Sequence, residues 1–211
     1  SCPADPVMVI QAMGRKIGYI PAAARLADPN REMPLQIYMA ESKVSLEQLG
    51  QNVIETLRDA GRCIVVVSEG FDVGDLGASR DTFGHVQFSA SQTTVAQVVT
   101  NYINSLDLPV PGKARFQIPG TDQRNAIAYA SVVDLDEAYR VGCHAVTVAR
   151  NDGNGSMATI LRDRSRGGYS VTYDKVPLEQ VAAKDRSFPE HWIAPNRIDV
   201  TDAFLDYARP L

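Results

Sequence analysis

The chain has 211 residues, of which 45% are hydrophobic and 22% are charged, and it carries a formal net charge of -4. This composition is typical of a globular segment that can build one sizeable hydrophobic core or two small ones. The acidic balance argues against a nucleic-acid or anionic-membrane partner, because phosphate groups are attracted to basic surfaces. No apolar run approaches the roughly 20 residues that a membrane span requires.

Three cysteines, Cys2, Cys63 and Cys143, lie far apart in the sequence. Their spacing matches neither a CxxC motif nor a Cys/His zinc pattern, so no zinc site or disulfide framework is indicated. We therefore expect reduced thiols and a cytoplasmic location.

The first third of the chain alternates strand and helix patterns. Three short apolar runs predict buried parallel strands: VMVIQ at 7–11, PLQIYMA at 34–40 and CIVVVSE at 63–69. Between them, residues 20–27 are rich in Ala, and residues 46–61 show one apolar helix face that begins after Ser45 and ends at Gly61. This order predicts the α/β class, with a parallel Rossmann-like sheet and helices on both faces.

The rest of the chain contains a long polar segment and further alternating elements. Residues 70–92 are rich in Gly, Asp and Ser, and we expect a long surface excursion there. The remaining predicted elements are a helix at 93–106, a strand at 113–118, a helical stretch from 121 that is interrupted near 131–134, strands at 153–163 and 167–176, and a terminal helix within 195–211. We expect Thr201 or Asp202 to cap that last helix.

Polar and charged residues follow three of the predicted strands. They are Met13-Gly14-Arg15 after the first strand, Glu69 at the end of the third, and Thr121, Gln123 and Arg124 after the strand that contains Arg115. In doubly wound sheets, ligands bind where the carboxyl ends of the strands meet. Two arginines with backbone amides at a helix start can bind an anion, and a carboxylate nearby can accept from sugar hydroxyls. The pattern thus predicts a sugar-phosphate pocket.

Structural interpretations of the same residues stay open. Met13-Gly14-Arg15 also fits a strand-to-helix turn with a surface arginine, and Glu69 also fits a solvated strand end. Arg115 also fits a surface residue, and Arg124 fits a simple ion pair.

Other polar residues suit structural roles. We expect His85 to be exposed, His144 to be packed and His191, beside Trp192, to lie at the surface or an interface. Asp134, Asp136 and Glu137 suit a helix start, where carboxylates interact favourably with the macrodipole.

The ordered motifs MGRKIGYI, VVVSEG and KARFQIPGTDQR together resemble the acceptor half of the 6-phosphofructokinases. In that family, a Met-Gly-Arg, a later Glu at a strand end, and an Arg followed nine residues on by the Arg of Gly-His-x-Gln-Arg bind fructose 6-phosphate. Arg115 and Arg124 reproduce this nine-residue interval, with Gly120 and Gln123 in register. The segments DTFGHVQFS, ASVVDLDEAYRVGCHAV and DAFLDYARPL resemble the pyrophosphate-dependent branch more than the bacterial ATP-dependent branch.

The resemblance implies part of a two-domain phosphofructokinase fold and a parent enzyme that transfers a phosphoryl group to the 1-hydroxyl of fructose 6-phosphate, giving fructose 1,6-bisphosphate. The implied donor is pyrophosphate rather than ATP, with Mg2+ as cofactor and a homo-oligomer as the assembly. The implied substrate-binding residues are Met13, Gly14, Arg15, Glu69, Arg115, Thr121, Gln123 and Arg124, with Arg115 reaching the site of an adjacent subunit.

The sequence departs from the family pattern in three places. Thr121 replaces the usual His of Gly-His-x-Gln-Arg, and Pro6 stands where many relatives have an Arg that reaches a neighbouring subunit. The family's glycine-rich donor loop and its Thr-Ile-Asp-Asn-Asp catalytic segment are absent from these residues. We therefore expect a carboxy-terminal, acceptor-binding portion that is inactive alone, with the Mg2+ ligands and the catalytic Asp in the other half.

The resemblance also implies a division of the chain. We expect residues 1–124 to form the fructose 6-phosphate-binding subdomain, residues 125–162 to pack with the donor-binding half, and residues 163–211 to return to the acceptor subdomain as a strand and a helix. The alternative function is a non-catalytic, phosphofructokinase-like regulatory module that binds a sugar phosphate.

Overall fold

The structure is a computed structural model that describes residues 5–74, 79–80, 86–87, 93–163 and 168–211. It divides into two compact units. Unit 1 comprises Ser1–Asn125 and Ser187–Ala208, and unit 2 comprises Ala126–Arg186 and Arg209–Leu211.

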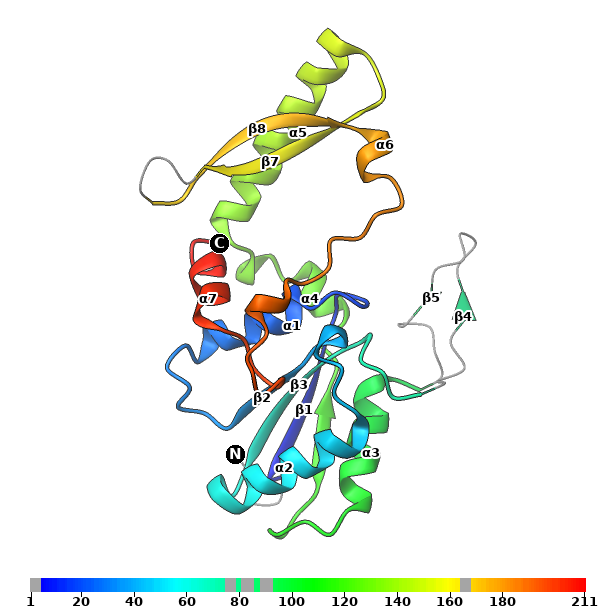
Figure 1. The fold of residues 1–211 in the computed structure, drawn as a ribbon, viewed down its shortest axis with the longest axis vertical. Coiled ribbons are helices and arrows are strands. Elements are labelled where there is room, and N and C mark those ends of the chain that lie inside the picture. The colour runs from blue at the N-terminus through cyan, green and yellow to red at the C-terminus, as the bar shows by residue number, and fades with distance from the viewer. Residues whose placement is uncertain (1–4, 75–78, 81–85, 88–92, 164–167) are drawn as a thin grey trace. The chain divides into compact units, whose positions relative to one another are not determined.

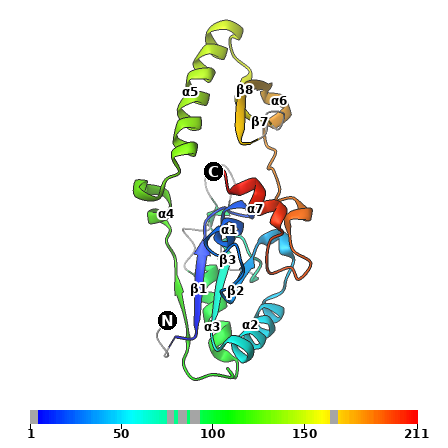
Figure 2. The same ribbon diagram turned by 90° about the vertical axis from the view of Figure 1, so that its left-hand side faces the viewer.

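Unit 1 is built on a four-stranded parallel sheet (Figures 1 and 2). Its strands are β1 (Val7–Ala12), β2 (Leu35–Tyr38), β3 (Cys63–Ser68) and β6 (Ala114–Gln117), in the order β2-β3-β1-β6. Val9 of β1 pairs with Val65 of β3 and with Phe116 of β6, which fixes the register of the central strands. The three strands expected from the apolar runs, the strand expected at 113–118 and the α/β class are confirmed.

The helices of unit 1 include two long ones, α2 (Leu46–Ala60) and α3 (Val95–Ser105). The Ser45 hydroxyl accepts from the backbone N–H of Gln48 at 3.2 Å, and Gly61 ends α2 with a φ of 69°. These are the caps that the sequence predicts. The predicted helix at 20–27 is instead divided into α1 (Tyr19–Ala23) and a 3-10 turn (Ala24–Ala27). The remaining α-helices of this unit are α4 (Thr121–Asn125) and α7 (Asp202–Ala208).

Alternate residues of β1, β2 and β3 face two separate hydrophobic layers. Val65 and Val67 of β3 pack into one layer with side chains from α2 and α3, such as Val53 and Val99. Val66 faces the other layer, which contains Ala22 of α1, Trp192 and Phe204 of α7. Because strand side chains alternate between faces, a sheet that is covered on both faces needs continuous apolar runs. This explains why the strand sequences show no polar alternation.

The segment 70–92 contains a pair of short antiparallel strands, β4 (Ser79–Arg80) and β5 (Val86–Gln87). They were not predicted, because two residues are too few to show a periodic pattern. His85 and most of the DTFGHVQFS segment lie outside the described residues.

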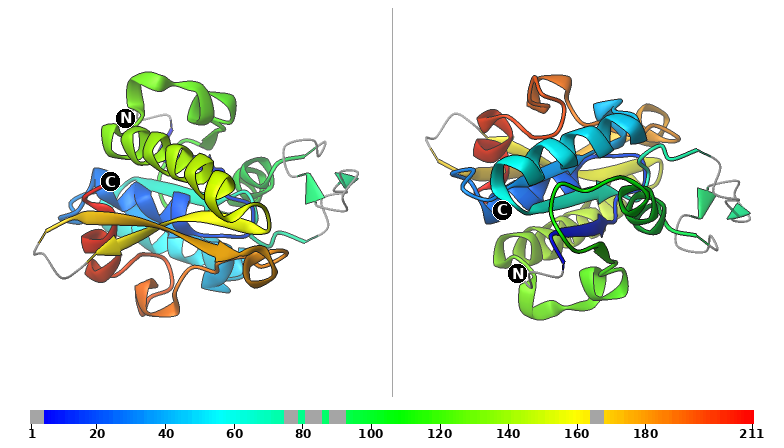
Figure 3. Two further views of the ribbon diagram at one scale, coloured as in Figure 1. Left: turned by 90° about the horizontal axis from the view of Figure 1, so that it is seen from above. Right: turned by 90° about the horizontal axis from the view of Figure 1, so that it is seen from below.

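Unit 2 consists of a long helix, α5 (Val132–Asp152), and a hairpin of β7 (Ser156–Asp163) and β8 (Ser170–Pro177), followed by α6 (Leu178–Val181). Figure 3 shows the twisted hairpin with α5 running along it. The hairpin is antiparallel over its whole length, from Ser156 opposite Pro177 to Asp163 opposite Ser170. Both predicted strands are confirmed, and the predicted interruption near 131–134 is the start of α5.

Unit 2 extends through Arg186 and also includes the last three residues, Arg209–Leu211. The strand expected to return to the first subdomain after residue 162 is β8, and it belongs to unit 2 because all eight of its residues pair with β7. The chain returns to unit 1 only at Ser187.

Within the described residues, no helix has both the length and the apolar character that crossing a membrane requires.

Candidate functional site

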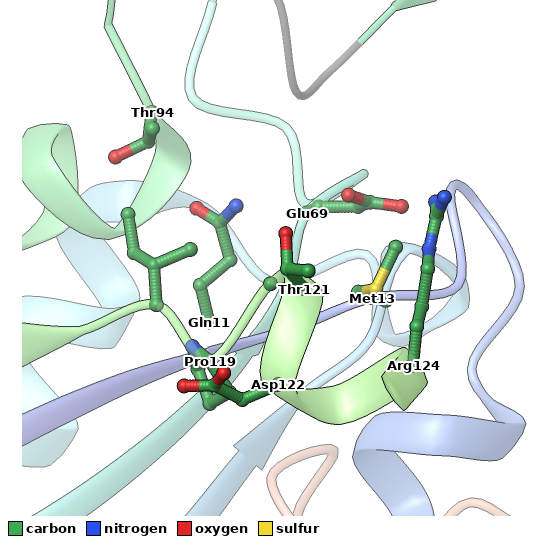
Figure 4. A pocket seen from close by; sticks show the side chains of 10 residues that line it. Gln11, Met13, Glu69, Thr94, Pro119, Thr121, Asp122 and Arg124 are labelled. Atoms are coloured by element: carbon green, nitrogen blue, oxygen red, sulfur yellow. The ribbon is translucent and has the colours of Figure 1, made fainter. Parts of the chain in front are cut away.

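A pocket of about 480 Å³ opens in unit 1 at the carboxyl ends of the parallel strands (Figure 4). Its walls come from the ends of β1 and β3, the start of α3 and the turn that follows β6. The lining residues are Gln11, Met13, Glu69, Thr94, Ile118, Pro119, Gly120, Thr121, Asp122 and Arg124. Four of the sequence-predicted residues line this pocket: Met13, Glu69, Thr121 and Arg124. A fifth, Gly14, lies beside it and donates a hydrogen bond from its backbone N–H to Glu69.

Glu69 is 8% exposed and joins the end of β3 to the Met13-Gly14-Arg15 loop. Its Oε1 accepts from the backbone N–H of Gly14 at 3.1 Å and from that of Arg15 at 2.8 Å. Among the described residues, none donates a hydrogen bond to its Oε2. One carboxylate oxygen thus holds the loop, which leaves the other as an acceptor for a ligand.

Two glycines allow the loops to approach each other closely. Gly14 has a φ of 126°, in the region that favours glycine. A Cβ on Gly70 would lie 2.1 Å from the carbonyl oxygen of Arg15, so this position tolerates no side chain. The Ser68 hydroxyl donates to the same carbonyl at 2.9 Å. The Met-Gly-Arg and Ser-Glu-Gly motifs are therefore two halves of one packed junction.

Gln123 joins the same loop to the turn after β6. Its Oε1 accepts from the backbone N–H of Met13 at 3.1 Å, across 110 residues of sequence. Gln123 lies on α4 between Thr121 and Arg124, both of which line the pocket. This hydrogen bond couples the turn that carries Arg124 to the loop that carries Arg15.

The backbone amides of the loop do not face the pocket as donors, which differs from the sequence-based expectation. Met13 donates to Gln123, and Gly14 and Arg15 donate to Glu69. The amides of Met13, Gly14 and Arg15 are therefore already bonded within the protein and are not free to bind an anion.

The arginines are placed unequally. Arg124 lines the pocket, whereas the Arg15 side chain is exposed and is not part of the lining. Arg115 lies opposite Met8 near the start of β1, away from the carboxyl ends of the strands, and forms an ion pair with Asp5. The structure does not bring Arg115 into the pocket of its own chain.

Gln11 and Thr94 are among the pocket residues that the sequence did not predict. Gln11 is 6% exposed, and its Oε1 accepts from the backbone N–H of Ala96 at 2.9 Å. Thr94 is the N-cap of α3 and accepts from Gln97 at 3.2 Å. A polar residue at the end of the otherwise apolar run VMVIQ was the signal that could have identified Gln11.

The histidines that the structure describes lie outside the pocket. The ring of His144 on α5 is half-buried, with its centroid 6.3 Å from that of Tyr173. His191 is exposed, with its ring centroid 5.5 Å from that of Trp192. Asp134 lies in the first turn of α5, as expected, while Glu137 is buried and accepts from the Tyr169 hydroxyl at 2.6 Å.

The cysteines that the structure describes are not catalytic candidates. Cys63 is buried in β3, and desolvation raises the pKa of its thiol to about 12, so the thiolate is scarce at neutral pH. Cys143 is exposed on α5, in the other unit.

The described residues contain no cluster of side chains that could bind a metal ion. Across these ranges, no group of three or more His, Cys, Asp or Glu side chains is arranged to hold one. The pocket lining offers two carboxylates, a guanidinium, a carboxamide and hydroxyl groups for recognition.

The chain is similar to known proteins over most of its length. A family model described as Phosphofructokinase matches residues 2–149. A pyrophosphate--fructose 6-phosphate 1-phosphotransferase of Rhodospirillum rubrum is 34% identical over 209 residues, which cover 94% of this chain and 50% of the relative. The corresponding protein of Methylococcus capsulatus is 30% identical and is covered to 48%.

Solved structures show the same partial coverage. A pyrophosphate-dependent phosphofructokinase from Nitrosospira multiformis superposes with a TM-score of 0.79 at 30% identity, over 99% of this chain and 48% of the other. The chain spans about half the length of the relatives that it matches.

Proposed function

The chain belongs to the phosphofructokinase family, and from this premise we propose that it binds fructose 6-phosphate as the acceptor portion of a pyrophosphate-dependent enzyme. The reaction is phosphoryl transfer to the 1-hydroxyl, which gives fructose 1,6-bisphosphate. One observation carries the proposal: Glu69, Thr121 and Arg124 line one pocket, at the strand ends where this fold binds ligands.

The proposed roles follow from charge and position. Arg124 and Arg15 bind the 6-phosphate, since a guanidinium can donate two parallel hydrogen bonds to phosphate oxygens. Glu69 accepts from sugar hydroxyls through Oε2 while Oε1 holds the Gly14 and Arg15 amides. Thr121 stands near the phosphate, where it can donate or accept but cannot carry the charge of the family's usual His.

Two of the sequence-based roles take a modified form. Met13 and Gly14 shape the sugar site, with their amides already bonded to Gln123 and Glu69. Arg115 lies away from the pocket of its own chain, which supports a role toward the phosphate site of an adjacent subunit in a homo-oligomer.

The transfer itself requires groups that we place outside this chain. The 1-hydroxyl oxygen attacks the terminal phosphorus of pyrophosphate, the bond to the leaving phosphate breaks, and the hydroxyl proton passes to a base. Such transfer depends on positioning and on neutralisation of the phosphate charges. We place the base, the donor and Mg2+ in the other half of the parent enzyme, which acts in the cytoplasm. The names of the relatives support pyrophosphate over ATP.

Calorimetric titration of the 211-residue chain with fructose 6-phosphate tests the proposal. We expect saturable binding that the Arg124→Ala variant weakens by about tenfold to a hundredfold, as for the loss of charge-assisted hydrogen bonds. Arg58→Ala is the matched control, because Arg58 is exposed in the last turn of α2, away from the pocket. Absence of binding by the wild-type chain, or equal losses in both variants, contradicts the proposed function.

Inactivity of the isolated chain is tested separately. With pyrophosphate, Mg2+ and fructose 6-phosphate, the purified chain should form no fructose 1,6-bisphosphate above the background rate. Measurable turnover that scales with protein concentration would show that this chain does hold a catalytic base.

A non-catalytic sugar-phosphate-binding module is the second candidate. It is favoured by Thr121 in the pocket and by Pro6, which is buried beside β3 and cannot reach another subunit's phosphate. The coding sequence that neighbours this segment discriminates the two, because an intact Asp-containing catalytic segment supports the enzyme and its loss supports the module.

A further inference from the structure

Gln11 is a buried polar side chain that lines the pocket without a role in the proposed phosphate or loop contacts. It is the fifth residue of β1 and is 6% exposed, so most of the side chain is removed from water while the carboxamide lines the pocket. Buried carboxamides are normally hydrogen-bonded at both the oxygen and the nitrogen. Both the Oε1 atom and the Nε2 atom of Gln11 should therefore have a hydrogen-bond partner.

The oxygen end is fixed by α3. Gln11 Oε1 accepts from the backbone N–H of Ala96 at 2.9 Å, in the first turn of the helix, where N–H groups have no partner within the helix. The neighbouring N–H of Gln97 donates to Thr94. Because only the oxygen of a carboxamide accepts, this bond also sets the direction of the NH2 group.

The nitrogen end faces the pocket. Figure 4 shows Gln11 with its oxygen turned toward α3 and its nitrogen turned toward the side where Glu69 lies. Within the residues that the structure describes, Nε2 donates to no protein acceptor. A donor held in one direction in a nearly buried site is suited to an acceptor that a ligand brings.

Gln11 and Glu69 line the same pocket, and the chemistry of these two groups selects the ligand group. Gln11 Nε2 can only donate, and the Glu69 carboxylate can only accept. A hydroxyl group satisfies both at once, because its oxygen accepts from Nε2 and its proton goes to Glu69. A dianionic sugar-phosphate ester group cannot do so, since it has no proton to give and is repelled by the carboxylate.

We propose that Gln11 is a specificity-determining residue that donates from Nε2 to a sugar hydroxyl whose proton is donated to Glu69. The inference rests on the proposed function and adds a residue that recognises the sugar rather than its phosphate. A site built around such a fixed donor favours ligands that carry the hydroxyl over analogues that lack it, because the analogue leaves the oriented donor without its ligand acceptor.

The test variant is Gln11→Glu, which removes the Nε2 donor and keeps an oxygen that can accept from the backbone N–H of Ala96. A carboxylate oxygen can still accept from the Ala96 N–H, and its charge is favourable near the N-terminus of α3. Gln97→Glu is the matched control, because it adds the same charge to the exposed side of the same helix turn. Thermal unfolding of both variants reports whether the fold is kept.

Calorimetry then compares fructose 6-phosphate with inorganic phosphate. We expect Gln11→Glu to lower the affinity for fructose 6-phosphate at least tenfold relative to Gln97→Glu, the order of one hydrogen bond. Because the new carboxylate repels the phosphate of either ligand, the loss of affinity for fructose 6-phosphate should exceed the loss for inorganic phosphate, and equal losses for the two ligands overturn the inference. Equal affinities for fructose 6-phosphate in both variants overturn the inference and leave the proposed function standing. A wild-type chain that binds no fructose 6-phosphate overturns both.

A second measurement needs no variant. In the 15N-labelled wild-type chain, the side-chain NH2 resonances of Gln11 should shift on saturation with fructose 6-phosphate but not with inorganic phosphate. Unchanged Gln11 resonances at saturation would overturn the inference even if Gln11→Glu failed to fold.

Discussion

At the scale of single residues, Gly70 shows how a loop motif is enforced by contact rather than by pattern. A Cβ there would lie 2.1 Å from the Arg15 carbonyl oxygen, so Gly70→Ala must displace the loop that Glu69 and Ser68 hold. We expect it to lower the free energy of unfolding by about 1–3 kcal/mol, as for overpacking. Urea unfolding measures this, and the affinity for fructose 6-phosphate should fall with it.

The control for Gly70→Ala is Gly142→Ala. Gly142 lies within α5, and a Cβ there would meet no atom within 4 Å. Replacing a helix glycine by alanine should be neutral or stabilising by up to about 1 kcal/mol. If both variants were equally stable, the close approach of Arg15 and Gly70 would not constrain the loop.

Gln123 gives a second residue-scale prediction, on the coupling of two loops. Gln123→Met removes the acceptor for the Met13 N–H and keeps a side chain of similar length. Because Gln123 is exposed, the free energy of unfolding should change by no more than about 0.5 kcal/mol. Calorimetry should nevertheless show weaker binding of both fructose 6-phosphate and inorganic phosphate, since the turn carrying Arg124 is released. Gln117→Met, on the exposed side of β6, should match the wild type in both measurements.

The site could be predicted from the sequence in part. The positions of Glu69, Thr121 and Arg124 at one edge of the sheet followed from the strand ends. The bonds of Glu69 to the Gly14 and Arg15 amides did not, because they depend on loop dihedral angles that no periodicity encodes. Gln11 was missed because its partner, Ala96, is 85 residues away.

At the scale of elements, apolar runs predicted the sheet well because a two-sided core demands them. The weaker predictions involved short elements. The stretch expected as a helix at 20–27 ends in a 3-10 turn, where Arg25 is held by contacts that are distant in sequence. Its guanidinium is 2% exposed and donates to Asp28, to Asp199 and to the Leu35 carbonyl at 2.8–2.9 Å.

The different burial of Arg25 and Arg31 predicts that replacing them lowers the free energy of unfolding by different amounts. Arg25→Met leaves the Asp28 and Asp199 carboxylates without their buried partner, and we expect a loss of about 3–5 kcal/mol in the free energy of unfolding. Arg31 contacts Asp199 and Asp202 but is 39% exposed, so Arg31→Met should cost about 1 kcal/mol or less. Urea denaturation of the two variants gives the comparison, and similar losses would mean that burial of Arg25 does not determine its contribution.

At the scale of the whole molecule, unit 2 has an apolar helix face that its own residues leave uncovered. On α5, Leu135, Tyr139 and Val146 are 49%, 74% and 70% exposed. Their spacing places them on one face of the helix, whereas Val148 of the opposite face is buried. Large exposed apolar patches mark interaction surfaces. The patch supports the proposal that residues 125–162 pack against the other half of the parent enzyme.

The same face predicts the solution behaviour of the 211-residue chain. Without the other half, two chains can bury the Leu135–Tyr139–Val146 face against each other, so sedimentation velocity should show association that increases with concentration. The double variant Tyr139→Glu/Val146→Glu should sediment as a monomer, because burying a carboxylate in an apolar contact is unfavourable. Thr147→Glu adds a charge at an exposed position beside this face and should associate like the wild type. A wild-type chain that stays monomeric at every concentration would show that this face does not drive self-association, whereas association that persists in the double variant would assign it to another surface.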